Sequence, residues 1–141
     1  MTTTDNPSPQ PTAAGTPTTG TDVIDTYIAV WNETDEARRN VLIESALGID
    51  LWYRDPMIEA DGREAFAAAI TMVQETLPGH VMSRTSDVDG HHDLVRFNWA
   101  LGQPGEAPVF AGVDVVKYDG EGRLHRIIGF AGETITDPGG V

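Results

Sequence analysis

The chain has 141 residues, and its 22 acidic against 9 basic side chains give a formal net charge of −13 at pH 7. This length suits one domain with a single core, and the negative field excludes nucleic acid and anionic membrane surfaces as partners. There is no cysteine, no apolar run long enough to span a membrane and no secretory signal pattern, so we expect a soluble, cytoplasmic protein without disulfides or thiolate sites.

Both ends of the chain lack residues that build a core. Residues 1–21 are rich in Thr and Pro and contain no large apolar residue after Met1, so we expect a disordered tail. Residues 136–141 include the run Asp-Pro-Gly-Gly and are expected to form a short flexible tail. One folded domain is therefore expected over residues 22–135.

Apolar residues at helical spacing predict two helices before the first strand. The first starts at Thr21 or Asp22, either of which can cap it. The second follows a polar break at residues 32–35 and ends at Gly48, with Arg39 on its solvent-exposed side. The buried stripe of the first helix comprises Val23, Ile24, Tyr27, Ile28 and Trp31.

An aromatic strand follows and ends on a carboxylate. Residues 51–53, Leu-Trp-Tyr, favour a pleated backbone, while Pro56 stops the strand and keeps Asp55 extended. After a short loop, apolar residues at helical spacing predict a third helix, which Pro78-Gly79 stops. This helix is expected to pack beside the strand that presents Asp55.

The C-terminal half consists of β-branched and aromatic segments separated by turn residues, which predicts an antiparallel meander. The strands are expected over residues 81–87, 92–101, 109–118 and 124–132. Their connectors are residues 89–90, 103–106 and 119–122. Helices first and strands afterwards predict an α+β fold, with three N-terminal helices packed on one face of a curved antiparallel sheet.

The strand over residues 109–118 is largely apolar on both faces. We expect helices to cover one face and a second subunit to cover the other, and hence a homodimer. A ligand pocket is expected between the helices and the sheet.

Three polar residues do not fit the core pattern. Asp114 lies among valines within a strand, where an ionised carboxylate is costly unless it is paired. It either faces solvent or pairs with Arg96, or it is a buried carboxyl with a raised pKa that donates a hydrogen bond to a substrate oxygen. Asp55 either stabilises a turn before Pro56 or acts as a base, in an environment that differs from that of Asp114. Tyr27 either reaches water at the rim or needs a buried partner.

No metal or cofactor site is predicted. His91 and His92 are adjacent in an expected strand, so their side chains point to opposite faces and cannot easily share one ion. A partial calcium-loop pattern around residues 87–90 fails, because Arg96 stands where a bidentate Glu is needed. No phosphate-binding or dinucleotide-binding fingerprint occurs.

The order of elements and the positions of Tyr27, Asp55-Pro56 and Asp114 resemble the cone-shaped fold of nuclear transport factor 2, in its SnoaL-like and ketosteroid-isomerase-like branches. The resemblance spans residues 22–133. Tyr27 and Asp114 look like the two oxyanion-hole residues of the isomerase, and Asp55 looks like its general base. In two other branches the match is poorer: residues 127–130 lack the late aspartate of SnoaL-type cyclases, and residues 96–98, Arg-Phe-Asn, lack the first aspartate of the epoxide-hydrolase pair.

The resemblance implies a cofactor-free acid–base enzyme that acts on a small hydrophobic carbonyl compound, steroid-like or polyketide-like. In this interpretation Asp55 abstracts a proton next to the carbonyl, while Tyr27 and neutral Asp114 stabilise the enolate. The alternatives are a non-catalytic ligand-binding or dimerisation module, or a relative of the polyketide cyclases or epoxide hydrolases. The candidate substrate-binding residues are Trp31, Trp52, Phe66, Phe97, Trp99, Phe110 and Phe130.

Overall fold

The computed structural model describes residues 21–132. Three helices and seven strands make up this part of the chain. The helices are α1 (Thr21–Asn32), α2 (Glu36–Ala46) and α3 (Arg63–Thr76). The strands are β1 (Leu47–Arg54), β2 (Glu59–Asp61), β3 (Val81–Arg84), β4 (Asp89–His91), β5 (Leu94–Gly102), β6 (Phe110–Tyr118) and β7 (Leu124–Ala131). The tails expected at residues 1–21 and 136–141 lie outside the described residues, apart from Thr21, which begins α1.

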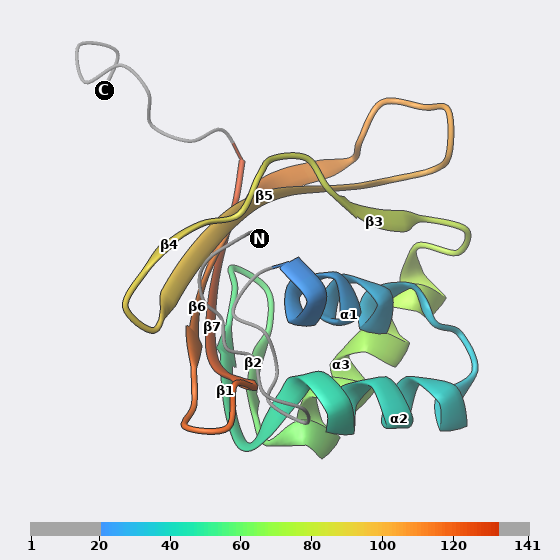
Figure 1. The fold of residues 1–141 in the computed structure, drawn as a ribbon. Helices are drawn as coiled ribbons and strands as arrows, with labels where there is room; N and C mark the ends of the chain where they lie inside the picture. The colour runs from blue at the N-terminus through green and yellow to red at the C-terminus, as the bar shows by residue number, and fades with distance from the viewer. Residues whose placement is uncertain (1–20, 133–141) are drawn as a thin grey trace, which may run out of the picture.

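The strands form one sheet in the order β2-β1-β7-β6-β5-β3, and β4 also pairs with β5. Figure 1 shows the three helices on one side of this sheet, which curves over them. The predicted α+β architecture is therefore confirmed. The sheet is mixed, because β7 returns beside β1 and pairs with it in parallel, whereas every other pair is antiparallel.

Two element boundaries differ from the sequence-based expectation. Gly48 does not end α2, because the helix stops at Ala46 and Gly48 is already in β1. Residues 89–90 do not form a turn, because they belong to β4 and pair with β5. The chain reverses at His92 and Asp93 instead, and His92 adopts a positive φ of 55°.

Arg39 is buried, with 2% of its surface exposed, although helical spacing places it on the solvent side of α2. Its guanidinium donates to the Glu33 carbonyl, to Gln74 Oε1 and to Thr71 Oγ1. These neutral acceptors come from the α1–α2 connection and from α3, so the arginine joins the helices to one another.

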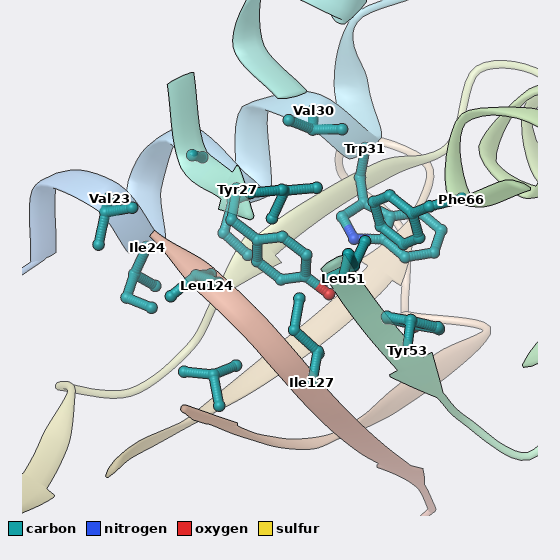
Figure 2. Packing of buried hydrophobic residues seen from close by; sticks show 14 of the residues in the cluster. Val23, Ile24, Tyr27, Val30, Trp31, Leu51, Tyr53, Phe66, Leu124 and Ile127 are labelled. Carbon is teal, nitrogen blue, oxygen red and sulfur yellow. The ribbon is translucent and has the colours of Figure 1, made fainter. Parts of the chain in front are cut away.

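The core lies between the helices and the concave side of the sheet (Figure 2). Tyr27 of α1 and Phe66 of α3 are fully buried in it, as is Ile127 of β7. Within residues 21–132, no helix is long and apolar enough to cross a membrane. The core thus surrounds the one tyrosine that the sequence singled out on α1.

Candidate functional site

The structure joins Tyr27 and Asp114 in the core. The Tyr27 hydroxyl donates a hydrogen bond of 3.0 Å to Asp114 Oδ2, and the two residues are 0% and 2% exposed. Asp114 lies in β6 between Phe97 of β5 and Gly129 of β7, and its bond to Tyr27 shows that its side chain points from the sheet toward α1. Neither the solvent-facing alternative nor a pair with Arg96 applies, and Arg96 instead bonds Asp89 at 2.9 Å.

Near neutral pH, Asp114 is divided between its protonated and ionised forms. Burial raises the pKa of Asp114 to about 7, and the charge of Asp55 acts in the same direction, whereas Tyr27 and Trp99 oppose the rise. Burial and the charge of Asp114 also raise the pKa of Tyr27 well above its usual value. The pair can therefore present a neutral phenol and a neutral carboxyl together.

Asp55 is held at the end of β1 by both of its oxygens. Oδ1 accepts hydrogen bonds of 2.8 Å from the backbone N–H groups of Met57 and Ile58, which is the turn chemistry expected before a proline. Oδ2 accepts a hydrogen bond of 2.6 Å from the Tyr53 hydroxyl. The neighbouring Arg54 points away, as strand alternation requires, and pairs with acidic residues of β2.

Gly129 separates the two carboxyl groups. A Cβ atom at this position would lie 2.8 Å from Asp114 Oδ1 and 3.3 Å from Asp55 Cβ. Only a residue without a side chain leaves room there for the carboxyl group of Asp114. Asp55 and Asp114 thus approach the same point of β7, which fits the effect of the Asp55 charge on the pKa of Asp114.

Replacing Gly129 with alanine is expected to displace the Asp114 carboxyl group and to lower the free energy of unfolding by about 1 to 3 kcal/mol, because the added methyl overpacks a buried site. Gly120 is the matched control, since a Cβ there meets no atom within 4 Å. Gly120→Ala is expected to stay within about 1 kcal/mol of wild type. Urea unfolding of both variants checks this, and equal stabilities would contradict the proposed crowding.

Four of the seven aromatic candidates lie around the pair. Phe66 and Phe97 are buried, and their ring centroids lie 6.3 and 6.2 Å from that of Tyr27. Trp31 packs edge-on against Phe66 at 5.5 Å, and Trp99 is buried on the same side of β5 as Phe97. Together these rings give the pair an apolar setting.

The other three aromatic candidates are placed elsewhere. Trp52 alternates with the buried Leu51 and Tyr53, so it lies on the outer face of the sheet, where the Arg54 guanidinium is 4.3 Å from its ring centroid. Phe130 is 59% exposed and alternates with the buried Gly129. Phe110, at the start of β6, is 40% exposed. The structure therefore brings none of the three to the Tyr27–Asp114 pair.

Tyr53 and Gly129 belong to the site, but sequence reasoning did not select them. Tyr53 stands two residues before Asp55, which directly follows β1 in an extended conformation, so strand periodicity puts both side chains on one face and could have indicated their contact. Burial raises the pKa of Tyr53 well above its usual value, which keeps its hydroxyl a donor toward Asp55. The closeness of Gly129 depends on the pairing of β6 with β7, which no local pattern reveals.

The two adjacent histidines do not behave as strand neighbours. His91 ends β4 and His92 lies in the following turn, which brings their Nδ1 atoms to 3.1 Å. The argument from opposite strand faces therefore does not apply to them. Within residues 21–132, however, no group of three or more His, Asp or Glu side chains is arranged to hold a metal ion.

The fold is similar to that of several solved proteins, although no family model and no curated protein matches the sequence. A proposed isomerase of the SnoaL-like family from Agrobacterium tumefaciens strain C58 is 33% identical, with a TM-score of 0.76 over 82% of this chain and 98% of that chain. An NTF2-like protein of unknown function from Exiguobacterium is 19% identical, with a TM-score of 0.64 over 79% and 99%. A proposed polyketide cyclase from Sinorhizobium meliloti is 13% identical, with a TM-score of 0.60 over 77% and 93%. The last two similarities concern the fold alone.

Proposed function

The chain belongs to the SnoaL-like family and has its NTF2-like cone fold, and on this premise we propose that it is a cofactor-free acid–base enzyme that enolises a small hydrophobic carbonyl compound, steroid-like or polyketide-like. One observation carries the proposal: a buried tyrosine bonded to a carboxyl group with a pKa of about 7, with a second carboxylate across a glycine. Two carboxyl groups in such different settings can divide the roles of base and hydrogen-bond donor.

In the proposed reaction Asp55 removes a proton from the carbon next to the substrate carbonyl. The electron pair of that C–H bond forms a C=C bond, and the carbonyl oxygen becomes an enolate oxygen. The Tyr27 hydroxyl turns its single hydrogen from Asp114 Oδ2 to this oxygen, and the protonated Asp114 donates to it as well. Each such donor can contribute about 3 to 4 kcal/mol to transition-state stabilisation. Asp55 then returns the proton to another carbon, so that the double bond migrates.

Tyr53 is proposed to position the base. Its hydroxyl occupies one site on Asp55 Oδ2, and the two turn N–H groups hold Oδ1, so the carboxylate has one orientation. A fixed base needs no reorganisation when the substrate binds. Because these three hydrogen bonds occupy both oxygens of Asp55, they also favour a second candidate function. This is a non-catalytic ligand-binding module in which Asp55 only stabilises the turn.

The outer face of the sheet suggests a homodimer. Phe130 pairs with Val113, and Ile128 pairs with Val115, which gives an apolar patch across β6 and β7 where Phe130 is 59% exposed. We propose that a second copy of the chain covers this patch. Sedimentation equilibrium is expected to give twice the chain mass for wild type and a monomer for Phe130→Glu, and a monomeric wild type would contradict the proposal.

The proposed activity is tested with a panel of β,γ-unsaturated ketones that includes a steroid. Migration of the double bond into conjugation is followed by its ultraviolet absorbance. We expect catalysed migration with at least one member of the panel. Ligands that bind without any migration above the uncatalysed rate would favour the binding-module alternative.

A further inference from the structure

Two buried indole nitrogens near the Tyr27–Asp114 pair have no acceptor. Trp31 is 7% exposed and Trp99 is 9% exposed, and among the residues between 21 and 132 neither Nε1 atom has a hydrogen-bond partner. A buried N–H group without an acceptor destabilises a fold, and native proteins leave few of them.

Each indole lies beside one member of the pair. Trp31 follows Tyr27 by one turn of α1, and its Nε1 approaches the Tyr27 hydroxyl closely enough to oppose the rise in the pKa of that group, without reaching hydrogen-bonding geometry. Figure 2 shows this nitrogen on the edge of the indole that faces the Tyr27 hydroxyl.

The Trp99 indole lies beside Asp114, as the Trp31 indole lies beside Tyr27. It lies in β5 opposite Gly112, which precedes Asp114 by two residues in β6, so the two side chains share the concave face of the sheet. Its indole opposes the rise in the pKa of Asp114, again without an aligned hydrogen bond. The free donors thus flank the pair, one from the helix layer and one from the sheet.

We propose that the indole N–H groups of Trp31 and Trp99 are ligand-binding donors that hold an acceptor oxygen of the ligand beside Tyr27 and Asp114. This inference rests on the proposed function, because it takes the pair as the place where the ligand oxygen binds. An indole N–H donates and cannot accept, so the group bound there carries an acceptor such as a ketone or enolate oxygen and is not an ammonium group. The contact would also give both indole N–H groups a hydrogen-bond acceptor.

Trp52 provides a matched control, because the sequence contains three tryptophans and Trp52 lies on the outer face between Arg54 and Arg126. In protein labelled with ¹⁵N, the indole N–H signals are followed during addition of 2-tetralone, and again with tetralin, which has the same rings without the oxygen. We expect 2-tetralone alone to move the signals of Trp31 and Trp99 downfield, while the Trp52 signal stays in place. Signals that do not move with 2-tetralone, or that tetralin moves equally, would overturn the proposal.

A second measurement separates the N–H contact from packing. Trp31→Phe and Trp99→Phe each keep an aromatic ring and remove the donor. The ratio of the tetralin to the 2-tetralone dissociation constant is expected to fall about 10-fold in either variant and to stay unchanged in Trp52→Phe. Equal losses for both ligands would show that only ring volume matters and would overturn the proposal.

Neither measurement requires turnover, so the two proposals fail independently. Signals that move while no member of the ketone panel is turned over would support the indole donors and contradict the proposed function. Enolisation of 2-tetralone while the indole signals stay in place would contradict the proposal for the indole donors and support the proposed function.

Discussion

Replacing Asp55 with asparagine is expected to lower the rate of double-bond migration by about 100- to 10,000-fold, the range that a positioned general base contributes. An asparagine can keep the Oδ1 acceptor for the turn N–H groups of Met57 and Ile58, so the end of β1 is expected to persist. The variant therefore removes the basic oxygen and retains the local fold. Initial rates of ultraviolet absorbance change give the comparison.

Asp61 supplies the control for this variant. It is a nearby aspartate whose side chain is 72% exposed and pairs with Arg54 at the surface. Asp61→Asn changes the net charge as Asp55→Asn does, but it is expected to leave the rate within about twofold, because exposed ion pairs contribute little. If Asp55→Asn retained the wild-type rate and unfolded at the wild-type temperature, Asp55 would not be the base.

The free energy of unfolding of Asp114→Asn is expected to rise relative to that of wild type as the pH is raised from 5 to 8. The pKa of Asp114 is about 7 in the folded protein, above the value of about 3.9 in an unfolded chain. The folded state therefore holds the proton more tightly, and wild-type stability is lost as the pH rises from about 4 through 7. Full ionisation removes about 4 kcal/mol, and asparagine has no charge to bury.

Urea unfolding of both proteins across pH 5 to 8 measures this difference. Subtracting the two curves cancels the other titrating groups, because only residue 114 differs. A stability difference that does not change with pH would contradict a raised pKa at Asp114.

The same proton controls the proposed activity. Above pH 7 Asp114 loses the hydrogen that it would donate to the enolate, so the wild-type rate is expected to fall. The asparagine variant is expected to be slower at pH 6 and to lack this alkaline decline. A wild-type profile that is flat from pH 6 to 8 would mean that the ionisation of Asp114 has no effect on catalysis.

Local patterns in the sequence predicted most of the fold. Helical spacing located α1 and α3, and β-branched segments located β5 to β7, because both periodicities report which face of an element is buried. The parallel pairing of β1 with β7 and the burial of Arg39 were not predicted, since both depend on elements that meet only in the folded chain.

The site was predictable where residues violated their local pattern. Asp114 among valines and Tyr27 on an apolar stripe were both selected for this reason, and the structure bonds them to each other. Trp52 and Phe130 were selected for their aromatic character alone, which does not say which face of the sheet they occupy. The roles of these residues in catalysis remain predictions.

Deuterium uptake tests the central claim most directly. The protein is incubated in heavy water with 2-tetralone, and the loss of proton signal next to the carbonyl is followed for wild type and for Asp55→Asn. The proposed mechanism predicts exchange that exceeds the uncatalysed rate with wild type and that falls to the uncatalysed rate with the variant. Exchange that is equal in both proteins, while 2-tetralone binds to each, would contradict acid–base catalysis by Asp55.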